Sequence, residues 1–345
     1  MMDRRHVCVL YGGRSLERDV SLVTGRRVIR ALKDRGYRVT DIDVDESLVR
    51  RLTELRPDAA FVALHGRGGE DGTVQELLEI LRIPYTGSGV PASIKAVDKV
   101  LAKHIFLAAG VPTPPFYAFS DAAFREMGAK DSLETIAEDL GLPVVVKPSS
   151  QGSALGVNFA VDARDLPRAM MSALSFDRKV LLEKYVAGRE LAISLLESPA
   201  CLDPGAPGAL GAPRVTGAPG DHATPNELQV LPIVEAVPRK EHAYYDFDSR
   251  YILGETEFIV PAELPNEQSE DVRRVAELAY RALGCSGFGR VDVILDVEGV
   301  PWVLEVNTIP GLTESSLMPL AAEAAGMSFG DLVERMMATA FAPRR

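Results

Sequence analysis

The first hundred residues alternate short apolar runs with segments of helical spacing. Residues 17–32 have the periodicity of an amphipathic helix, and three apolar runs predict strands at 7–11, 37–44 and 59–64. Such alternation predicts a parallel sheet covered by helices, whose ligands bind beyond the carboxyl ends of the strands. Three glycine-rich loops are expected at those ends, at 12–15, 65–72 and 86–89. Together they predict that a ligand binds at this edge of the sheet.

A long helix is predicted over residues 90–109. It carries Lys95, Lys99 and Lys103 at steps of four, so that all three lie on one stripe. The stripe by itself indicates a solvated helix face. The proline-rich residues 112–115 follow and are typical of a domain junction.

A β-branched strand ends at Lys147 and opens into a loop that contains Gly152, Gly156 and several serines. A flexible loop of this kind, with a lysine at its base, can surround phosphate oxygens with backbone amides. The chain contains no GxxxxGK[ST] motif, and no GxGxxG follows a strand, so any nucleotide is held by another fold. Residues 180–186 then predict a strand that contains Glu183.

The later half of the chain indicates a larger sheet. Residues 198–225 are rich in Ala, Gly and Pro, and we expect a mobile loop inserted between two strands. Residues 228–236 predict one strand, and 272–283 and 332–341 predict helices. The fold class is therefore α/β in the first half and α+β in the C-terminal half.

The strongest candidate for chemistry is a predicted hairpin at 287–311. Asp292 lies on its first strand and Glu305 and Asn307 on its second, and strand residues two apart face the same side. These oxygen ligands suit Mg²⁺, which completes its shell with water and substrate phosphates. Arg290 shares this face, as expected if a polyanion is transferred there. The alternative is an exposed polar face without a ligand.

Composition narrows the class of protein. The chain has 345 residues, 46% of them hydrophobic, and a net charge of −11, which argues against non-specific binding to nucleic acid. No apolar run has the length of a membrane span, and the start does not read as a signal peptide, so we expect a cytoplasmic protein without membrane contact. The three cysteines are widely spaced, which favours neither a disulfide framework nor a zinc site.

Six segments, in order, carry a resemblance to a known family: LERDVSL at 16–22, ALHGRGGEDG at 63–72, PYTGSG at 84–89, VKPS at 146–149, GRVD at 289–292 and LEVNTIPGLT at 304–313. The chain resembles the ATP-grasp ligases, and within them the D-alanine:D-alanine ligase family. The resemblance spans almost the whole chain. It implies an N-terminal pre-grasp parallel-sheet domain at 1–98, a central lid domain at 99–188, and a C-terminal catalytic domain at 189–345 that contains the insertion.

The resemblance implies a nucleotide site with ATP as co-substrate and two Mg²⁺ or Mn²⁺ ions. The ATP-binding positions are Lys99 and Lys147 for the phosphates, Glu183, Lys184 and Tyr185 for the adenine, Glu190 for the ribose, and Arg250. The metal ligands would be Asp292, Glu305 and Asn307. On this analogy Lys99 moves from the solvated stripe to the ligands, whereas Lys95 and Lys103 stay in solvent.

The resemblance also implies an activity. The family phosphorylates the carboxylate of one D-alanine, and the amine of a second D-alanine then attacks the acyl phosphate to give a dipeptide for peptidoglycan and hence the cell wall. The matching catalytic positions are Glu17, Ser153, Tyr251, Arg290 and Gly311. The matching substrate-binding positions are Glu17, His65, Ser316 and Leu317. A homodimer is implied as well.

The chain departs from the family pattern in three places. Arg250 stands where a lysine usually precedes the loop tyrosine, Gln151 and Ala154 stand where many relatives have an acidic residue and a second serine, and the Ala/Gly/Pro-rich insertion has no counterpart in compact relatives. Two alternative functions remain open. One is a D-alanine:D-lactate ligase, against which Tyr251 argues, and the other is a nucleotide-binding regulator without catalysis.

Overall fold

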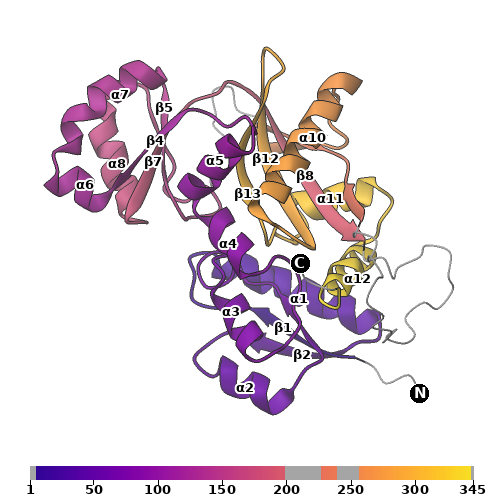
Figure 1. Cartoon of the computed structure of the whole chain (residues 1–345). Helices are drawn as coiled ribbons and strands as arrows, with labels where there is room; N and C mark the ends of the chain where they lie inside the picture. The colour runs from indigo at the N-terminus through magenta and orange to yellow at the C-terminus, as the bar shows by residue number, and fades with distance from the viewer. Residues whose placement is uncertain (1–4, 199–226, 239–255, 343–345) are drawn as a thin grey trace, which may run out of the picture.

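The structure is a computed structural model that describes residues 5–198, 227–238 and 256–342. The Ala/Gly/Pro-rich insertion, apart from its first residue, lies outside the described residues, and so do Arg250 and Tyr251. Within them the chain forms three sheets with covering helices (Figure 1).

The N-terminal sheet is parallel with the strand order β2-β1-β3. Its strands are β1 (His6–Tyr11), β2 (Arg38–Asp43) and β3 (Ala59–Val62), and its helices are α1 (Arg18–Asp34), α2 (Leu48–Leu55) and α3 (Thr73–Ile80). Alternate residues of β1 enter two cores: Val7 packs in the cluster that contains α1, and Leu10 in the one that contains α2 and α3. The predicted parallel sheet is confirmed.

The second sheet is antiparallel, has the order β4-β7-β5-β6, and stands to one side of the molecule (Figure 1). Its strands are β4 (Phe116–Ser120), β5 (Val144–Pro148), β6 (Asn158–Ala160) and β7 (Lys179–Lys184). Its helices are α6 (Asp121–Glu126), η1 (Ala129–Ser132), α7 (Leu133–Leu140), η2 (Ala163–Asp165) and α8 (Leu166–Leu174). They enclose a core of their own.

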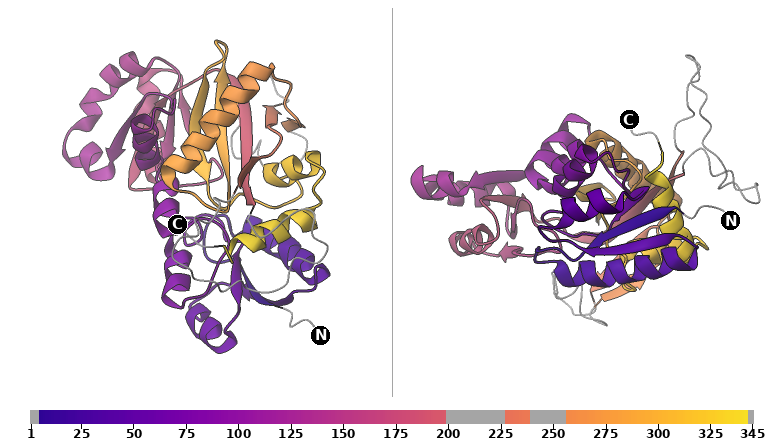
Figure 2. Two further views of the ribbon diagram at one scale, coloured as in Figure 1. Left: turned by 45° about the vertical axis from the view of Figure 1, so that its right-hand side comes forward. Right: turned by 90° about the horizontal axis from the view of Figure 1, so that it is seen from below.

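The third sheet is antiparallel, with the order β11-β10-β8-β12-β13 and with β9 paired to β8. Its strands are β8 (Gly188–Ser198), β9 (Glu227–Val230), β10 (Val234–Pro238), β11 (Thr256–Ile259), β12 (Phe288–Asp296) and β13 (Pro301–Asn307). Helix α10 (Asn266–Leu283) packs on one face, and α11 (Leu317–Ala324) and α12 (Phe329–Thr339) join this sheet to α1 in a common core (Figure 2).

The predicted helix over 90–109 was wrong in one respect, because it is two helices. Asp98 adopts an extended conformation (φ −83°, ψ 99°) between α4 (Val90–Val97) and α5 (Lys99–Ala108). Its carboxylate accepts hydrogen bonds from the N–H groups of Val100 and Leu101, and therefore caps α5. Both helices pack against the C-terminal sheet. The proposed domain bounds remain a prediction.

A second difference concerns residues 228–236, predicted as one strand. They belong to two strands, β9 and β10, which pair with different parts of β8. Between them, the N–H of Leu231 donates to the carbonyl of Ser194. Apolar character alone could not reveal the break, because Leu231 and Ile233 within it are buried like strand residues.

Candidate active site

A cleft of about 930 Å³, partly open to solvent, lies between the second and third sheets. Its lining includes the described nucleotide-binding candidates: Lys99, Lys147, Glu183, Lys184, Tyr185 and Glu190. Apolar side chains such as Leu155 and Phe159 complete the walls, and the Phe159 ring meets Tyr185 edge to face at 6.1 Å. A cleft that combines apolar walls with lysines and a few other polar side chains suits a ligand with a flat base and phosphates.

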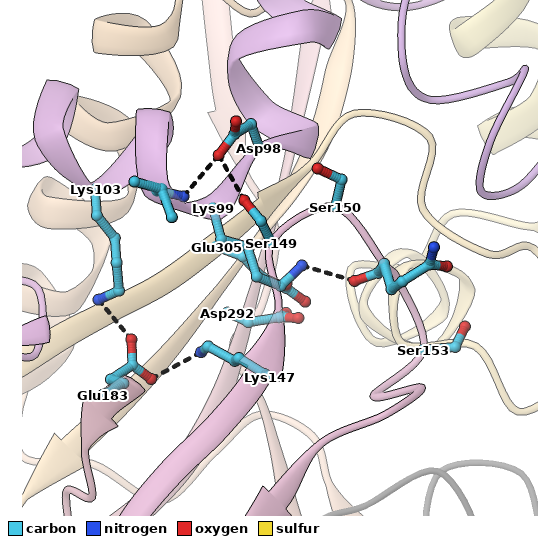
Figure 3. Close-up of polar contacts among 12 residues, drawn as sticks. Asp98, Lys99, Lys103, Lys147, Ser149, Ser150, Ser153, Glu183, Asp292 and Glu305 are labelled. Carbon is cyan, nitrogen blue, oxygen red and sulfur yellow. Dashed lines mark hydrogen bonds and ion pairs between the residues drawn. The ribbon is translucent and has the colours of Figure 1, made fainter. Parts of the chain in front are cut away.

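Glu183 lines this cleft and lies between the side chains of two lysines (Figure 3). Its Oε1 lies 2.7 Å from Lys147 Nζ, and its Oε2 lies 2.6 Å from Lys103 Nζ. Although burial alone raises the pKa of Glu183, the two ammonium groups hold it below its ordinary range. The carboxylate is therefore charged and fixed.

Lys103 is fully buried, so its predicted place in solvent was wrong. Its ammonium also lies 2.5 Å from Thr113 Oγ1 and 3.1 Å from the carbonyl of Pro114. Burial lowers the pKa of Lys103 to about 8, although Glu183 acts in the opposite direction. The regular spacing of lysines at every fourth residue could not distinguish this buried lysine from a solvated one. Lys95 is half-buried, with its Nζ 3.5 Å from the carbonyl of Leu283.

The break at Asp98 directs Lys99 into the cleft. The backbone N–H of Lys99 donates to the carbonyl of Ser149, and its Nζ lies 2.8 Å from the carbonyl of Gln151 in the glycine loop. Asp98 holds the same loop through the hydroxyl of Ser149 at 2.7 Å (Figure 3). Sequence reasoning missed Asp98, although an aspartate before a helical run is a known N-cap signal.

The predicted hairpin is confirmed as β12 and β13. Asp292 is directly opposite Glu305, and Arg290 is opposite Asn307. A register shift after Asp292 turns both Leu304 and Glu305 toward the cleft, a distortion that is common beside active sites. Simple alternation did not predict the position of Leu304.

The donor set on this face fits a divalent cation that shares its ligands with phosphate. Asp292 and Glu305 supply carboxylates and Asn307 supplies an amide oxygen. Arg290 binds Asp292 through two hydrogen bonds of 2.6 and 2.8 Å, and Lys99 Nζ lies 2.9 Å from Glu305. No group of three or more His, Cys, Asp or Glu side chains in the described parts of the chain could cage a metal. Phosphate and water oxygens would therefore complete the shell.

A second cavity adjoins this face and extends to the N-terminal sheet. It is lined by the described substrate-binding and catalytic candidates: Glu17, His65, Ser153, Arg290, Gly311, Ser316 and Leu317. Glu190 lines both cavities. The structure thus brings together every predicted site residue that it describes.

Glu17 is a buried carboxylate at the wall of this cavity. It accepts a hydrogen bond from the hydroxyl of Ser153, which belongs to the glycine loop. Burial, followed by the charge of Glu70, raises the pKa of Glu17 to about 7, although Ser153, His65 and Lys99 act in the opposite direction. A bound cation would restore the charged form of such a carboxylate.

His65 is buried beside Glu17 and held from two sides. Its Nδ1 lies 3.4 Å from Glu70 Oε1, and its Nε2 lies 3.2 Å from Thr24 Oγ1. Glu70 was not among the predicted site residues. It belongs to a predicted glycine-rich loop, which was the available signal.

The loop after β13 is closed by Ser316. The N–H of Thr313 donates to Ser316 Oγ at 2.9 Å, and the two hydroxyls are 2.7 Å apart. A Cβ at Gly311 would lie 2.9 Å from Ser316 Oγ, so a side chain there would displace the Ser316 hydroxyl. Ser316 also immediately precedes α11, which the sequence did not predict.

Residues 48–88 match the family model of the D-ala D-ala ligase N-terminus, and residues 105–205 and 223–338 match that of the D-ala D-ala ligase C-terminus. The chain belongs to the D-alanine–D-alanine ligase family. Relatives of that name from Geotalea uraniireducens and Pelotomaculum thermopropionicum are 42% and 40% identical over 336 and 331 residues. These regions cover 97% and 96% of this chain and 96% and 95% of the two relatives.

Solved structures of the family share the fold. The D-alanine–D-alanine ligase of Bacillus anthracis, complexed with ATP, has a TM-score of 0.76 and 30% identity, covering 98% of this chain and 97% of that one. The ATP-grasp fold expected from the resemblance is confirmed. Among the described residues, no helix combines the length and the apolar character that a membrane crossing requires.

Proposed function

We propose that the protein joins two molecules of D-alanine to D-alanyl-D-alanine, with cleavage of ATP to ADP and phosphate. The adjoining cavities carry the proposal: one suits a nucleotide, the other a small amino acid, and both open on the Asp292–Glu305 face. The names of the relatives and the ATP bound to the Bacillus anthracis enzyme support it.

In the nucleotide cleft, Lys99 and Lys147 are the proposed phosphate-binding residues. Both ammonium groups are nearly buried, and each already contacts a carboxylate. Glu183 is held between lysines and offers a fixed acceptor to the amino group of an adenine, with Lys184 and Tyr185 beside it. Glu190, which lines both cavities, is the proposed acceptor of hydrogen bonds from the ribose hydroxyls.

Asp292, Glu305 and Asn307 would hold two Mg²⁺ or Mn²⁺ ions. The bound ions would neutralise charge on the β- and γ-phosphates during transfer. Arg290 and Lys99, which pair with these carboxylates, lie close enough to exchange partners with a phosphate.

In the first chemical step, a carboxylate oxygen of the first D-alanine attacks the γ-phosphorus of ATP, and ADP leaves. Glu17 receives the ammonium of this D-alanine, while His65 forms the adjoining wall. Ser153 links Glu17 to the glycine loop, which excludes water from a product that hydrolyses readily. Tyr251 and Arg250, both outside the described residues, are proposed to complete the cover.

In the second step, the amine of the second D-alanine attacks the carbonyl carbon of the acyl phosphate. The tetrahedral intermediate has an oxyanion, for which Arg290 and the N–H of Gly311 are the proposed donors. The nitrogen then loses a proton to solvent, the bond between the carbonyl carbon and the phosphate oxygen breaks, phosphate leaves with the electron pair, and the amide forms. Ser316 and Leu317, which line the same cavity, are the proposed binding residues for the carboxylate of the second substrate.

The product distinguishes this function from that of a D-alanine:D-lactate ligase. Purified protein with ATP and Mg²⁺ should form the dipeptide from D-alanine alone, and added D-lactate should not divert it near neutral pH. Mass spectrometry of the products decides between them, and predominant ester would contradict the proposal. A regulator without catalysis would bind ATP and form neither product. A cytoplasmic homodimer stays a prediction.

A further inference from the structure

Two side chains of α1 reach the loop that follows β13. Arg27 donates a hydrogen bond from its Nη1 to the carbonyl oxygen of Leu312. The N–H of Leu312 lies 3.4 Å from the hydroxyl oxygen of Thr24. Thr24 and Arg27 are three residues apart and therefore occupy one face of the helix. Both backbone groups of Leu312, the residue after Gly311, thus contact the same helix.

The two side chains are themselves held in place. The guanidinium carbon of Arg27 lies 4.1 Å from the ring centroid of Phe329 at the start of α12. Burial lowers the pKa of Arg27, yet a guanidinium remains charged at any ordinary pH. Thr24 is almost fully buried, and its hydroxyl also contacts His65 Nε2 at 3.2 Å.

One helix therefore connects two walls of the substrate cavity. Through Thr24 it contacts both His65 and the loop of Gly311, and through Arg27 it contacts that loop a second time. Helices α1 and α12 pack side by side in a core that includes Leu312, which gives this connection a rigid support (Figure 2).

We propose that Arg27 and Thr24 are positioning residues, which fix the Gly311–Leu312 backbone so that the N–H of Gly311 points at the developing oxyanion. This inference rests on the proposed ligase function. Gly311 has no side chain that could fix its own conformation. The hydrogen bonds to the backbone groups of Leu312 fix it instead. A displaced oxyanion donor weakens stabilisation of the transition state without weakening nucleotide binding.

The number of dipeptides formed per ADP released tests this role. Displacement of Gly311 slows attack by the second D-alanine, so more of the acyl phosphate is lost to water and ADP appears without dipeptide. A variant that is merely less stable has fewer active molecules, but each keeps the normal ratio. The ratio thus separates positioning from a structural contribution.

The variant is Arg27→Met, and Arg26→Met is the matched control because Arg26 is exposed on the same helix. We expect Arg27→Met to lower kcat for the dipeptide by about tenfold, with the KM for ATP unchanged and the ratio well below one. Arg27→Lys should recover part of the ratio, because it retains a charged donor. Arg26→Met should match the wild type.

A ratio near one for Arg27→Met would overturn the inference, whether or not its kcat differs from that of the control. If Arg27→Met does not fold, Thr24→Val decides, because it leaves Arg27 and its packing on Phe329 in place. A normal ratio in Thr24→Val would then reject the role. If the wild type itself releases no ADP, it is the ligase function that fails, and this result is distinct from either outcome.

Discussion

Glu17 is expected to make the ligand-free protein less stable as pH rises, and Glu17→Gln should remove this effect. The carboxylate is buried beside Glu70 and is intended, on our account, for a substrate ammonium. Without that ammonium, its charged form is poorly accommodated. The glutamine side chain would retain the shape and the capacity to accept a hydrogen bond from Ser153, but it cannot ionise.

The pKa shift of Glu17 determines how much the free energy of unfolding changes with pH. The pKa of Glu17 is about 7 in the folded protein, against an ordinary value of 4.5. The folded state therefore binds the proton more tightly, and stability is lost as pH rises from about 4.5 through 7. The loss amounts to about 3 kcal/mol once pH exceeds 7. Glu17→Gln should thus resemble the wild type near pH 5 and be more stable by about 3 kcal/mol at pH 8.

Reversible denaturant unfolding of the ligand-free protein at several pH values provides the measurement. Asp19→Asn is the control, because Asp19 is an exposed carboxylate in the first turn of α1, the helix that begins directly after Glu17. The difference between this control and the wild type should not change across the range. D-alanine should raise the stability of the wild type at pH 8 and leave that of Glu17→Gln unchanged. A stability difference between Glu17→Gln and the wild type that is constant from pH 5 to 8 would refute the reasoning.

Three further results are expected. Glu305→Gln should lower kcat by about two orders of magnitude or more while the thermal unfolding midpoint stays the same, because the residue lies on a cleft face; near-normal turnover would reject the metal assignment. Lys103→Met should lower the free energy of unfolding by about 3 kcal/mol by leaving Glu183 with one buried cation, whereas Lys95→Met should cost far less; equal losses would show that the pair with Glu183 is unimportant. Finally, the KM for D-alanine should rise below pH 7 as Glu17 becomes protonated, while the KM for ATP stays level in steady-state assays; parallel changes would indicate a different titrating group.

The local pattern predicted β1, β3 and the hairpin of β12 and β13 because burial and periodicity leave a clear signal there. The hairpin of Asp292 and Glu305 follows directly from two alternating runs joined by a turn. Strands β1 and β3 of the parallel sheet follow from apolar runs that are buried almost throughout, whereas in β2 only Ile42 is buried. For both, short-range sequence determines the structure.

Features that depend on contacts between distant segments could not be predicted in this way. Lys103 is buried only because Glu183, some eighty residues away, provides its counter-charge. The helix break at Asp98 allows a hydrogen bond with Ser149, about fifty residues away in the loop after β5, although the N-cap preference of aspartate was visible. The contact of Arg27 with Leu312 spans most of the chain, and no local pattern indicates it.

Release of ADP that depends on D-alanine tests the central claim most directly. Purified protein is incubated with ATP and Mg²⁺ over a range of D-alanine concentrations, and ADP and D-alanyl-D-alanine are both quantified. We predict no ADP without D-alanine, saturable release with it, and one dipeptide for each ADP. No ADP above background at saturating D-alanine, or ADP without dipeptide, would contradict the ligase function.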